Sequence, residues 1–171
     1  KMSQTQVERL FIADRTSLMA DEWRLTSGIS TSGAGSVHIS SNWERNDTAG
    51  FALLSTGMTE SSGTFSFPST GIYEVQANLY ANGPSGGATT YMGIQIYGTQ
   101  DNSSYTIKSD GYGSSNASAY TCVTVHTSFD VTNTTNDKIR IHYNVGDAGT
   151  TIGGASTRSV TYVRFKKLGD T

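Results

Sequence analysis

Hydrophobic and polar residues alternate with a period of two along several segments of the chain. The clearest segments are 72–81, 119–129 and 138–145, where the apolar residues fall on one side of an extended strand. One apolar and one polar face is typical of an antiparallel sheet that is buried on one side. The expected inward residues are Tyr73, Val75, Ala77 and Leu79; Val123 and Val125; and Ile139, Ile141, Tyr143 and Val145.

Clusters of Gly, Asn, Asp and Ser separate these segments and mark turns between short strands. Since no helical crossovers lie between them, we predict an all-β antiparallel sandwich or barrel of about ten strands. The expected strands are 22–26, 37–42, 50–54, 63–67, 72–81, 89–97, 104–109, 119–129, 138–145 and 158–167. Loops are expected at 28–36, 82–88, 98–103, 110–118 and 146–156.

The first twenty residues have a different pattern. Thr5 and Glu8 have the spacing of a helix capping box, and a ragged helical stripe of apolar residues follows. The segment is too short to be a domain, so we divide the chain into an arm at 1–20 and a domain at 21–171. The arm either packs on its own domain or docks the domain onto a neighbour. In the second case its contact residues would be Leu10, Phe11 and Ile12.

The charge composition excludes several classes of partner. Lys plus Arg number 12 and Asp plus Glu 14, which gives a net charge of -2, and only 15% of residues are charged. The chain has neither the basic excess of a nucleic-acid-binding protein nor a run of about 18 apolar residues that could span a membrane. Its single cysteine, Cys122, excludes an intrachain disulfide and a multi-cysteine zinc site. We expect Cys122 to pack as a small side chain.

A motif at 65–77 connects the chain to a known fold. A Pro and a Gly make a tight turn at 68–71, between one strand and the next. The motif resembles the signature of the jelly-roll domains of the complement globular head and of tumour necrosis factor (TNF), and the segment 160–165 resembles the final central strand of that family. The resemblance implies a jelly-roll sandwich. The matching residues are Phe65, Gly71 and Tyr73, with Val75 and Ala77 where the family has aromatic residues.

Two further stretches, 21–27 and 57–63, resemble variants of this fold in structural proteins of marine bacteriophages. The resemblance implies a trimer on the outside of a particle, as capsid decoration or as part of a fibre or tail. We therefore expect a non-enzymatic homotrimer at the virion exterior, bound to other virion proteins through the arm. Trp23 within the first stretch has a structural interpretation of its own, as a lid over the core.

Tyrosines on the polar faces of the expected strands also favour a trimer. A tyrosine can bury its ring at a subunit interface and keep its hydroxyl hydrogen-bonded. The low content of charged residues also favours a subunit interface, because removing ions from water is costly. The alternative is that these are ordinary half-buried strand residues. The candidate trimer-interface residues are Tyr80, Tyr97 and Tyr162.

We assign no catalytic, cofactor-binding or metal-binding residue. Residues 83–87 have the pattern Gly-x-Ser-x-Gly around Ser85, but a strand rather than a helix follows, so a loop tip is favoured over a nucleophile elbow. The histidines His38, His126 and His142 lie on separate strands without the spacing of a metal motif. For the loops that contain Asp101 and Asp147, turn formation is favoured over calcium binding.

An alternative function is the binding of a host surface glycan. The expected loops are rich in Gly, Ser, Thr, Asn and Tyr, a composition that paratopes use for adaptable contacts. In this interpretation the chain is an adhesin or a secreted lectin-like domain of the same fold, and Tyr105 and Tyr112 stack on a sugar ring. A hydrolase would need a catalytic cluster that the sequence does not offer.

Overall fold

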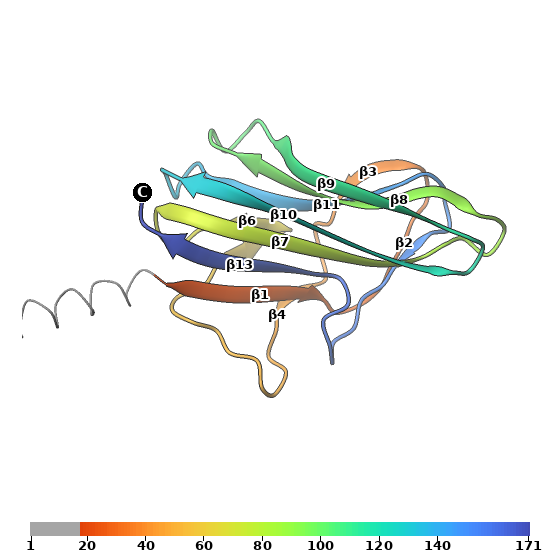
Figure 1. Cartoon of the computed structure of the whole chain (residues 1–171), viewed down its shortest axis with the longest axis horizontal. Helices are drawn as coiled ribbons and strands as arrows, with labels where there is room; N and C mark the ends of the chain where they lie inside the picture. The colour runs from red at the N-terminus through yellow and green to blue at the C-terminus, as the bar shows by residue number, and fades with distance from the viewer. Residues whose placement is uncertain (1–17) are drawn as a thin grey trace, which may run out of the picture.

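Two antiparallel β-sheets lie face to face in the computed structural model, which describes residues 18–171 (Figure 1). Sheet A contains β1 (Met19–Leu25), β2 (Ile29–Ser30), β4 (Trp43–Arg45), β7 (Gly71–Asn82), β10 (Tyr120–Val131), β12 (Thr151–Ile152) and β13 (Tyr162–Gly169). Sheet B contains β3 (Gly35–His38), β5 (Thr59–Ser61), β6 (Thr64–Ser66), β8 (Thr89–Thr99), β9 (Thr106–Ser115) and β11 (Lys138–Val145).

The long strand β7 organises sheet A. It pairs over its whole length with β10 and on its other side with β13 and, at its end, with β12. β1 continues the sheet beyond β13, and β4 follows β1. In sheet B the order is β5-β6-β11-β8-β9, with β3 also paired to β11. The prediction of an all-β antiparallel sandwich is confirmed.

The inward faces of the two sheets form one hydrophobic core. The predicted inward residues of β7 and β11 are buried, and so is Val125 of β10, while Val123 packs against the core edge. Each fully buried large apolar side chain contributes roughly 1.5–3 kcal/mol. The period-two pattern therefore assigned these faces correctly. The buried aromatic residues at the centre are Phe65, Phe67, Tyr73, Phe129 and Phe165.

Trp23 covers one side of this core, as expected for a lid. Its ring meets Phe65 edge-on, with 5.8 Å between ring centroids. The Arg45 guanidinium lies over the Trp23 ring, 4.7 Å from its centroid, and so shields the indole from solvent.

The predicted strand at 50–54 is wrong. This segment is a loop, and within residues 18–171 its only ladder contact is an isolated bridge from Leu54 to Ala20. The short strand β4 already pairs with β1 at Trp23–Leu25, so the apolar segment does not extend the sheet. Leu53 and Leu54 remain exposed.

The predicted loop at 110–118 is wrong for residues 110–115, because β9 continues to Ser115. Its Gly111 and Gly113 face the neighbouring strand β10. A Cβ atom at Gly111 would lie 2.7 Å from the Val125 Cγ1 atom, and one at Gly113 2.7 Å from the Thr121 Cγ2 atom. The glycines that suggested a loop instead let β9 approach β10 closely.

At its N-terminal side, β1 begins at Met19, two residues before the predicted start of the domain. The predicted docking residues Leu10, Phe11 and Ile12 lie outside the described residues. The predicted tight turn at 68–71 is present, and Gly71 ends it with a φ angle of 137°. Within residues 18–171, no helix is long and apolar enough to cross a membrane.

Candidate functional site

The outer face of sheet A is a broad surface built mainly from β7 and β10. Alternate residues of these strands point away from the core, and cross-strand neighbours include Tyr80 with Cys122 and Asn78 with Thr124. The Tyr80 and Tyr120 rings stack with their centroids 5.2 Å apart, and Tyr120 is 65% exposed. Aromatic rings therefore cover one end of this face.

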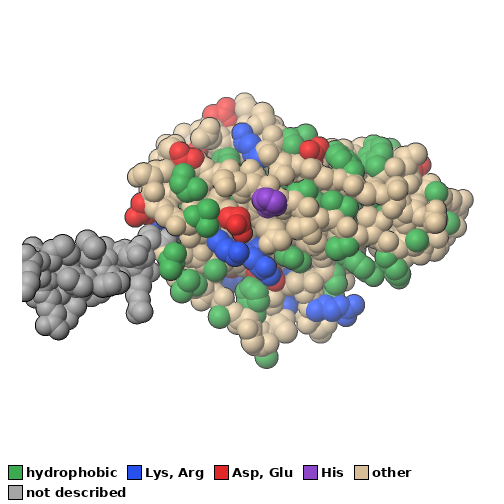
Figure 2. Space-filling view, viewed as in Figure 1, with side chains coloured by type: hydrophobic (Ala, Val, Ile, Leu, Met, Phe, Trp, Pro, Cys, Tyr) green, Lys and Arg blue, Asp and Glu red, His purple; other side chains and the backbone are tan. Residues whose placement is uncertain are grey.

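Uncharged groups dominate that end of the face. Figure 2 shows few charged side chains where β7 ends and β10 begins, whereas Lys, Arg, Asp and Glu gather nearer β1 and β13. Glu74 and Lys166 form an exposed ion pair there, with 3.2 Å between Oε1 and Nζ. Cys122 is exposed on the same face, which corrects the expectation that it packs as a buried small side chain.

A hydrogen-bond network already satisfies the polar groups at the centre of the face. The Asn78 Oδ1 atom accepts bonds from Thr124 Oγ1 at 2.7 Å and from Cys122 Sγ at 3.3 Å. The Asn78 Nδ2 atom donates to the Val160 carbonyl at 2.6 Å. Since these groups have partners within the chain, covering them with a second protein costs little.

Beside this face, two buried charged residues of β1 fasten the segment 44–48 to the sheet. Glu22 and Arg24 are each 1% exposed. The Arg24 guanidinium binds the carboxylates of Glu44 at 3.0 Å and of Asp47 at 2.6 Å. Glu22 accepts hydrogen bonds from Ser159, Asn46 and Arg164. Burial alone would raise the pKa of Glu22, but these bonds outweigh burial and lower its pKa.

The two stretches that resemble phage proteins contact each other. The Asp21 Oδ2 atom accepts a bond from the Met58 backbone N–H at 2.8 Å and one from Trp23 Nε1 at 3.0 Å. Arg45 Nε donates to Asp21 Oδ1 at 3.0 Å. These motif residues therefore hold the segment before β5 against β1, which is a structural role.

The outer face of sheet B points in the opposite direction and carries a row of aromatic rings. The His142 ring stacks on Tyr97 at 4.0 Å and on His38 at 5.3 Å between centroids. Burial, together with the charges of His38 and Arg140, lowers the pKa of His142 to about 4. The Arg140 guanidinium lies 3.8 Å from the centre of the Tyr105 ring.

Near this row, Tyr91, Tyr112 and Asn144 line a hollow of about 330 Å³, which we call the tyrosine hollow. The two tyrosine rings are nearly perpendicular, at 85°, with centroids 5.7 Å apart. Gly93 lies between Tyr112 on β9 and Asn144 on β11 in the strand register. A side chain at Gly93 would overlap the Tyr112 ring, so the missing Cβ atom opens the hollow.

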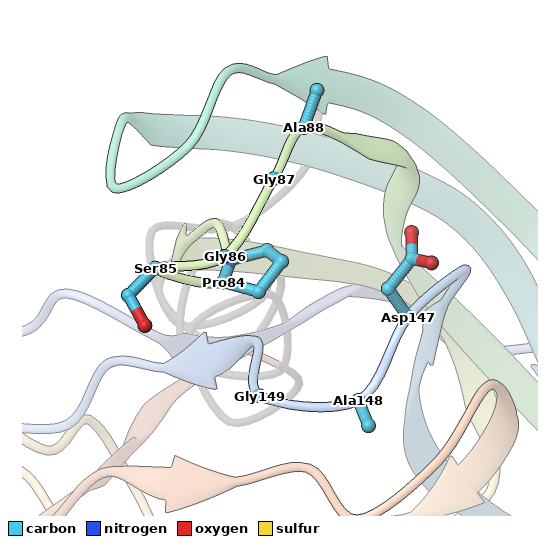
Figure 3. Close-up of a pocket in the computed structure, with 8 residues that line it drawn as sticks. All are labelled: Pro84, Ser85, Gly86, Gly87, Ala88, Asp147, Ala148 and Gly149. Atoms are coloured by element: carbon cyan, nitrogen blue, oxygen red, sulfur yellow. The ribbon is translucent and has the colours of Figure 1, made fainter.

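A second hollow lies at the loop end of the sandwich, between residues 84–88 and 147–149 (Figure 3). Its polar side chains are Ser85, which points away, and Asp147, whose Oδ2 atom accepts a bond from the Thr90 backbone N–H at 3.3 Å. As predicted, the Gly-x-Ser-x-Gly segment is a loop tip that leads into a strand, β8. Ser85 therefore lies at a loop tip and not at the strand-to-helix turn of a nucleophile elbow.

The calcium candidate Asp101 forms a turn, as expected. Its Oδ1 atom accepts bonds from the backbone N–H groups of Ser103 at 2.9 Å and Ser104 at 2.7 Å, and from Thr99 Oγ1 at 2.7 Å. These hydrogen bonds, with that of Ser104 the strongest, hold the pKa of Asp101 well below its usual range. Among residues 18–171, no three His, Cys, Asp or Glu side chains converge as a metal site.

The structure separates the predicted interface tyrosines. Tyr80 and Tyr162 lie on the outer face of sheet A, whereas Tyr97 lies on the opposite face, on sheet B. The predicted glycan contacts Tyr105 and Tyr112 both lie on the outer side of sheet B, but Arg140 covers the Tyr105 ring. The sequence interpretation missed three candidate residues because their neighbours lie on other strands: Tyr91, Tyr120 and Asn144.

Comparisons with known proteins agree on the fold. The crystal structure of murine APRIL at pH 5.0 has a TM-score of 0.65 and 14% identity, over 88% of this chain and 99% of that one. The structure of Eiger TNF from S. frugiperda has a TM-score of 0.63 and 15% identity, over 91% and 95% of the two chains. The chain has a TNF-like jelly-roll fold. No family model and no curated protein matches the sequence. The jelly-roll prediction is confirmed, and at this identity the likeness concerns the fold alone.

Proposed function

We propose that this chain is a non-enzymatic homotrimeric structural module on the exterior of a virus particle, as capsid decoration or as part of a fibre or tail. The observation that carries the trimer is the hydrogen-bonded, uncharged end of the outer face of sheet A, where β7 ends and β10 begins, in a TNF-like fold. The resemblance of 21–27 and 57–63 to bacteriophage structural proteins supports the location. Other virion proteins would bind the arm at 1–20.

The outer face of sheet A suits a permanent contact between subunits. Tyr80, Tyr120 and Tyr162 supply ring surface, and tyrosine is enriched at interfaces because it combines a ring with a hydrogen-bonding group. The bonds around Asn78 remove the cost of burying its amide. Opposite charges such as Glu74 and Lys166 lie toward the other end, where they would form a polar rim.

The lone cysteine gives a direct test of this interface. Cys122 is exposed in the single chain, so it should react freely with a maleimide unless a second subunit covers it. We expect Cys122 in the full chain to react at least about tenfold more slowly than an introduced cysteine on sheet B. The matched control is Cys122→Ser combined with Ser114→Cys, because Ser114 is exposed on the opposite sheet. Equal rates would contradict an interface on sheet A.

Truncation tests the attachment to a particle. Since Met19 and Ala20 pair with Lys167 and Lys166 in the sheet, the truncation should stop at residue 17. We expect the chain that begins at residue 18 to keep its trimer mass but to lose binding to purified particles. Undiminished particle binding after truncation would contradict docking through the arm, and absence of the full chain from purified particles would contradict the virion location.

A further inference from the structure

We propose that the tyrosine hollow, Tyr91, Tyr112 and Asn144 on the outer face of sheet B, binds a neutral carbohydrate ring. This inference goes beyond the proposed assembly role and does not rest on it. The hollow takes one residue from each of three neighbouring strands, β8, β9 and β11. Rigid strands hold binding groups more accurately than loops do.

Two glycines leave room for the two tyrosine rings. Tyr112 lies beside Gly93, where any side chain would overlap its ring. Tyr91 lies beside Gly146, where a Cβ atom would approach the Tyr91 Cε1 atom to 3.2 Å. The backbone therefore forms the floor of the hollow, and the two rings and the Asn144 amide form its walls.

A chain of hydrogen bonds holds the polar groups of the hollow in place. The Gln95 side chain is 2% exposed, and its Nε2 atom donates to Tyr112 Oη at 2.9 Å. The Gln95 Oε1 atom accepts a bond from Ser36 Oγ at 2.6 Å, which fixes the orientation of the amide. Asn144 Nδ2 also donates to Tyr112 Oη, at 3.3 Å. Two hydrogen bonds to its hydroxyl thus fix the position of the Tyr112 side chain.

These bonds leave hydrogen-bonding capacity for a ligand. The Asn144 Oδ1 atom is buried and has no hydrogen-bond partner in the described chain. An unpaired buried acceptor costs about 1–3 kcal/mol, so a ligand hydroxyl that donates to this oxygen once the Asn144 side chain turns toward the hollow recovers this free energy. Because Tyr112 Oη accepts two bonds, only its own hydrogen is left to donate, and it faces the Asp110 carboxylate. After burial, this hydrogen bond and the negative charge of Asp110 raise the pKa of Tyr112.

A sugar ring matches this combination of groups. Its hydroxyls can donate to Asn144 Oδ1 and to the Asp110 carboxylate, and its apolar C–H face can pack on an aromatic ring. The three lining residues are uncharged, and the neighbouring Asp110 is negative, so a phosphate or an acidic sugar finds no cation in the hollow. The chemistry favours a neutral pyranose.

The position of the hollow is compatible with assembly. The outer faces of sheets A and B point in opposite directions, so subunits joined through sheet A leave this hollow open (Figure 1). Three hollows on one particle module would bind a glycan surface with avidity far above that of one site.

Titration with neutral sugars tests the proposal. The full chain would be screened on an array of neutral and acidic glycans, and the affinity for the best neutral glycan measured in solution. We expect millimolar or tighter binding per site. Tyr112→Ala and Asn144→Ala should each weaken it at least about tenfold, whereas Tyr112→Phe, which keeps the ring, should lose less than Tyr112→Ala.

The matched control is Tyr97→Ala, a tyrosine on the same face of β8 that does not line the hollow. It should bind the glycan with unchanged affinity, and circular dichroism would confirm that each variant is folded. The proposal is overturned if no neutral glycan binds, if only acidic glycans bind, or if folded Tyr112→Ala and Asn144→Ala bind like the unmodified chain. A monomeric chain that binds glycan through the hollow would contradict the trimer and leave this proposal intact.

Discussion

At the scale of single residues, His142 is expected to make stability depend on pH. Its folded pKa of about 4 lies below the ordinary histidine value of 6.5. Between these values the unfolded chain binds more protons than the folded chain, so the free energy of unfolding falls as the pH is lowered through this window. Carboxylates such as Glu22, whose pKa is lowered, take up protons only below about pH 4.5. They therefore do not mask the change in the free energy of unfolding that His142 causes.

The test compares urea unfolding at pH 7 and pH 5. We expect the free energy of unfolding to be lower at pH 5, with about 1 kcal/mol of the difference due to His142 after allowance for its partial exposure. The variant His142→Gln should lose that share of the pH dependence. An identical pH dependence in the variant would show that His142 titrates normally in the folded chain.

A second prediction at this scale concerns Gly93. A methyl group there would strike the Tyr112 ring and lie 2.6 Å from the Gly111 carbonyl oxygen. We expect Gly93→Ala to lower the free energy of unfolding by about 1–3 kcal/mol, as overpacking does elsewhere. The control is Gly86→Ala, because no atom lies within 4 Å of the added Cβ atom at that position. Equal stability of the two variants in chemical denaturation would contradict the close packing at Gly93.

The sequence predicts individual residues well where one strand suffices. Tyr73 and Ile139 are assigned to the core by the alternation of their own strands, and both are 0% exposed. Asn144 is assigned by the same alternation to a polar face, but its contact with Tyr112 depends on the pairing of β11 with β8 and of β8 with β9. No pattern within one strand contains that register, which is why the hollow was not predictable.

At the scale of elements, Asp21 is the residue that joins β1 to the segment before β5. Its side chain is 0% exposed and binds Arg45, the Met58 N–H and the Trp23 indole. We expect Asp21→Ala to lower the free energy of unfolding by about 2–4 kcal/mol, because buried donors lose their acceptor. Asp110→Ala, at an exposed position of β9, should change it by less than about 0.5 kcal/mol.

Length made most strands predictable, but not β9, whose residues 110–115 were predicted to be a loop. The long strands β7, β8, β10 and β11 fall where alternation predicts them. The segments β2, β4, β5 and β12 have two or three residues each, which is too few to show a period. The apolar segment at 50–54 has the composition of a strand, but within the described part of the chain it forms only one isolated bridge, because β-pairing also requires a free sheet edge.

At the scale of the whole molecule, an added charge on sheet A should prevent assembly. Thr124 is exposed at the middle of β10 and bonds to Asn78. We expect Thr124→Arg to convert the trimer to monomers at micromolar concentration, because an unpaired buried charge is costly. Ser114→Arg adds the same side chain to the opposite sheet and should leave the trimer intact. Dissociation by both variants or by neither in size-exclusion chromatography would contradict the assignment of the interface.

The central claim is that three copies of this fold assemble through sheet A. The most direct measurement is the mass of the full chain in native buffer, by light scattering at micromolar concentration. We expect a single species at three times the chain mass of 18.2 kDa. A stable species of 18.2 kDa across the concentration range would contradict the account.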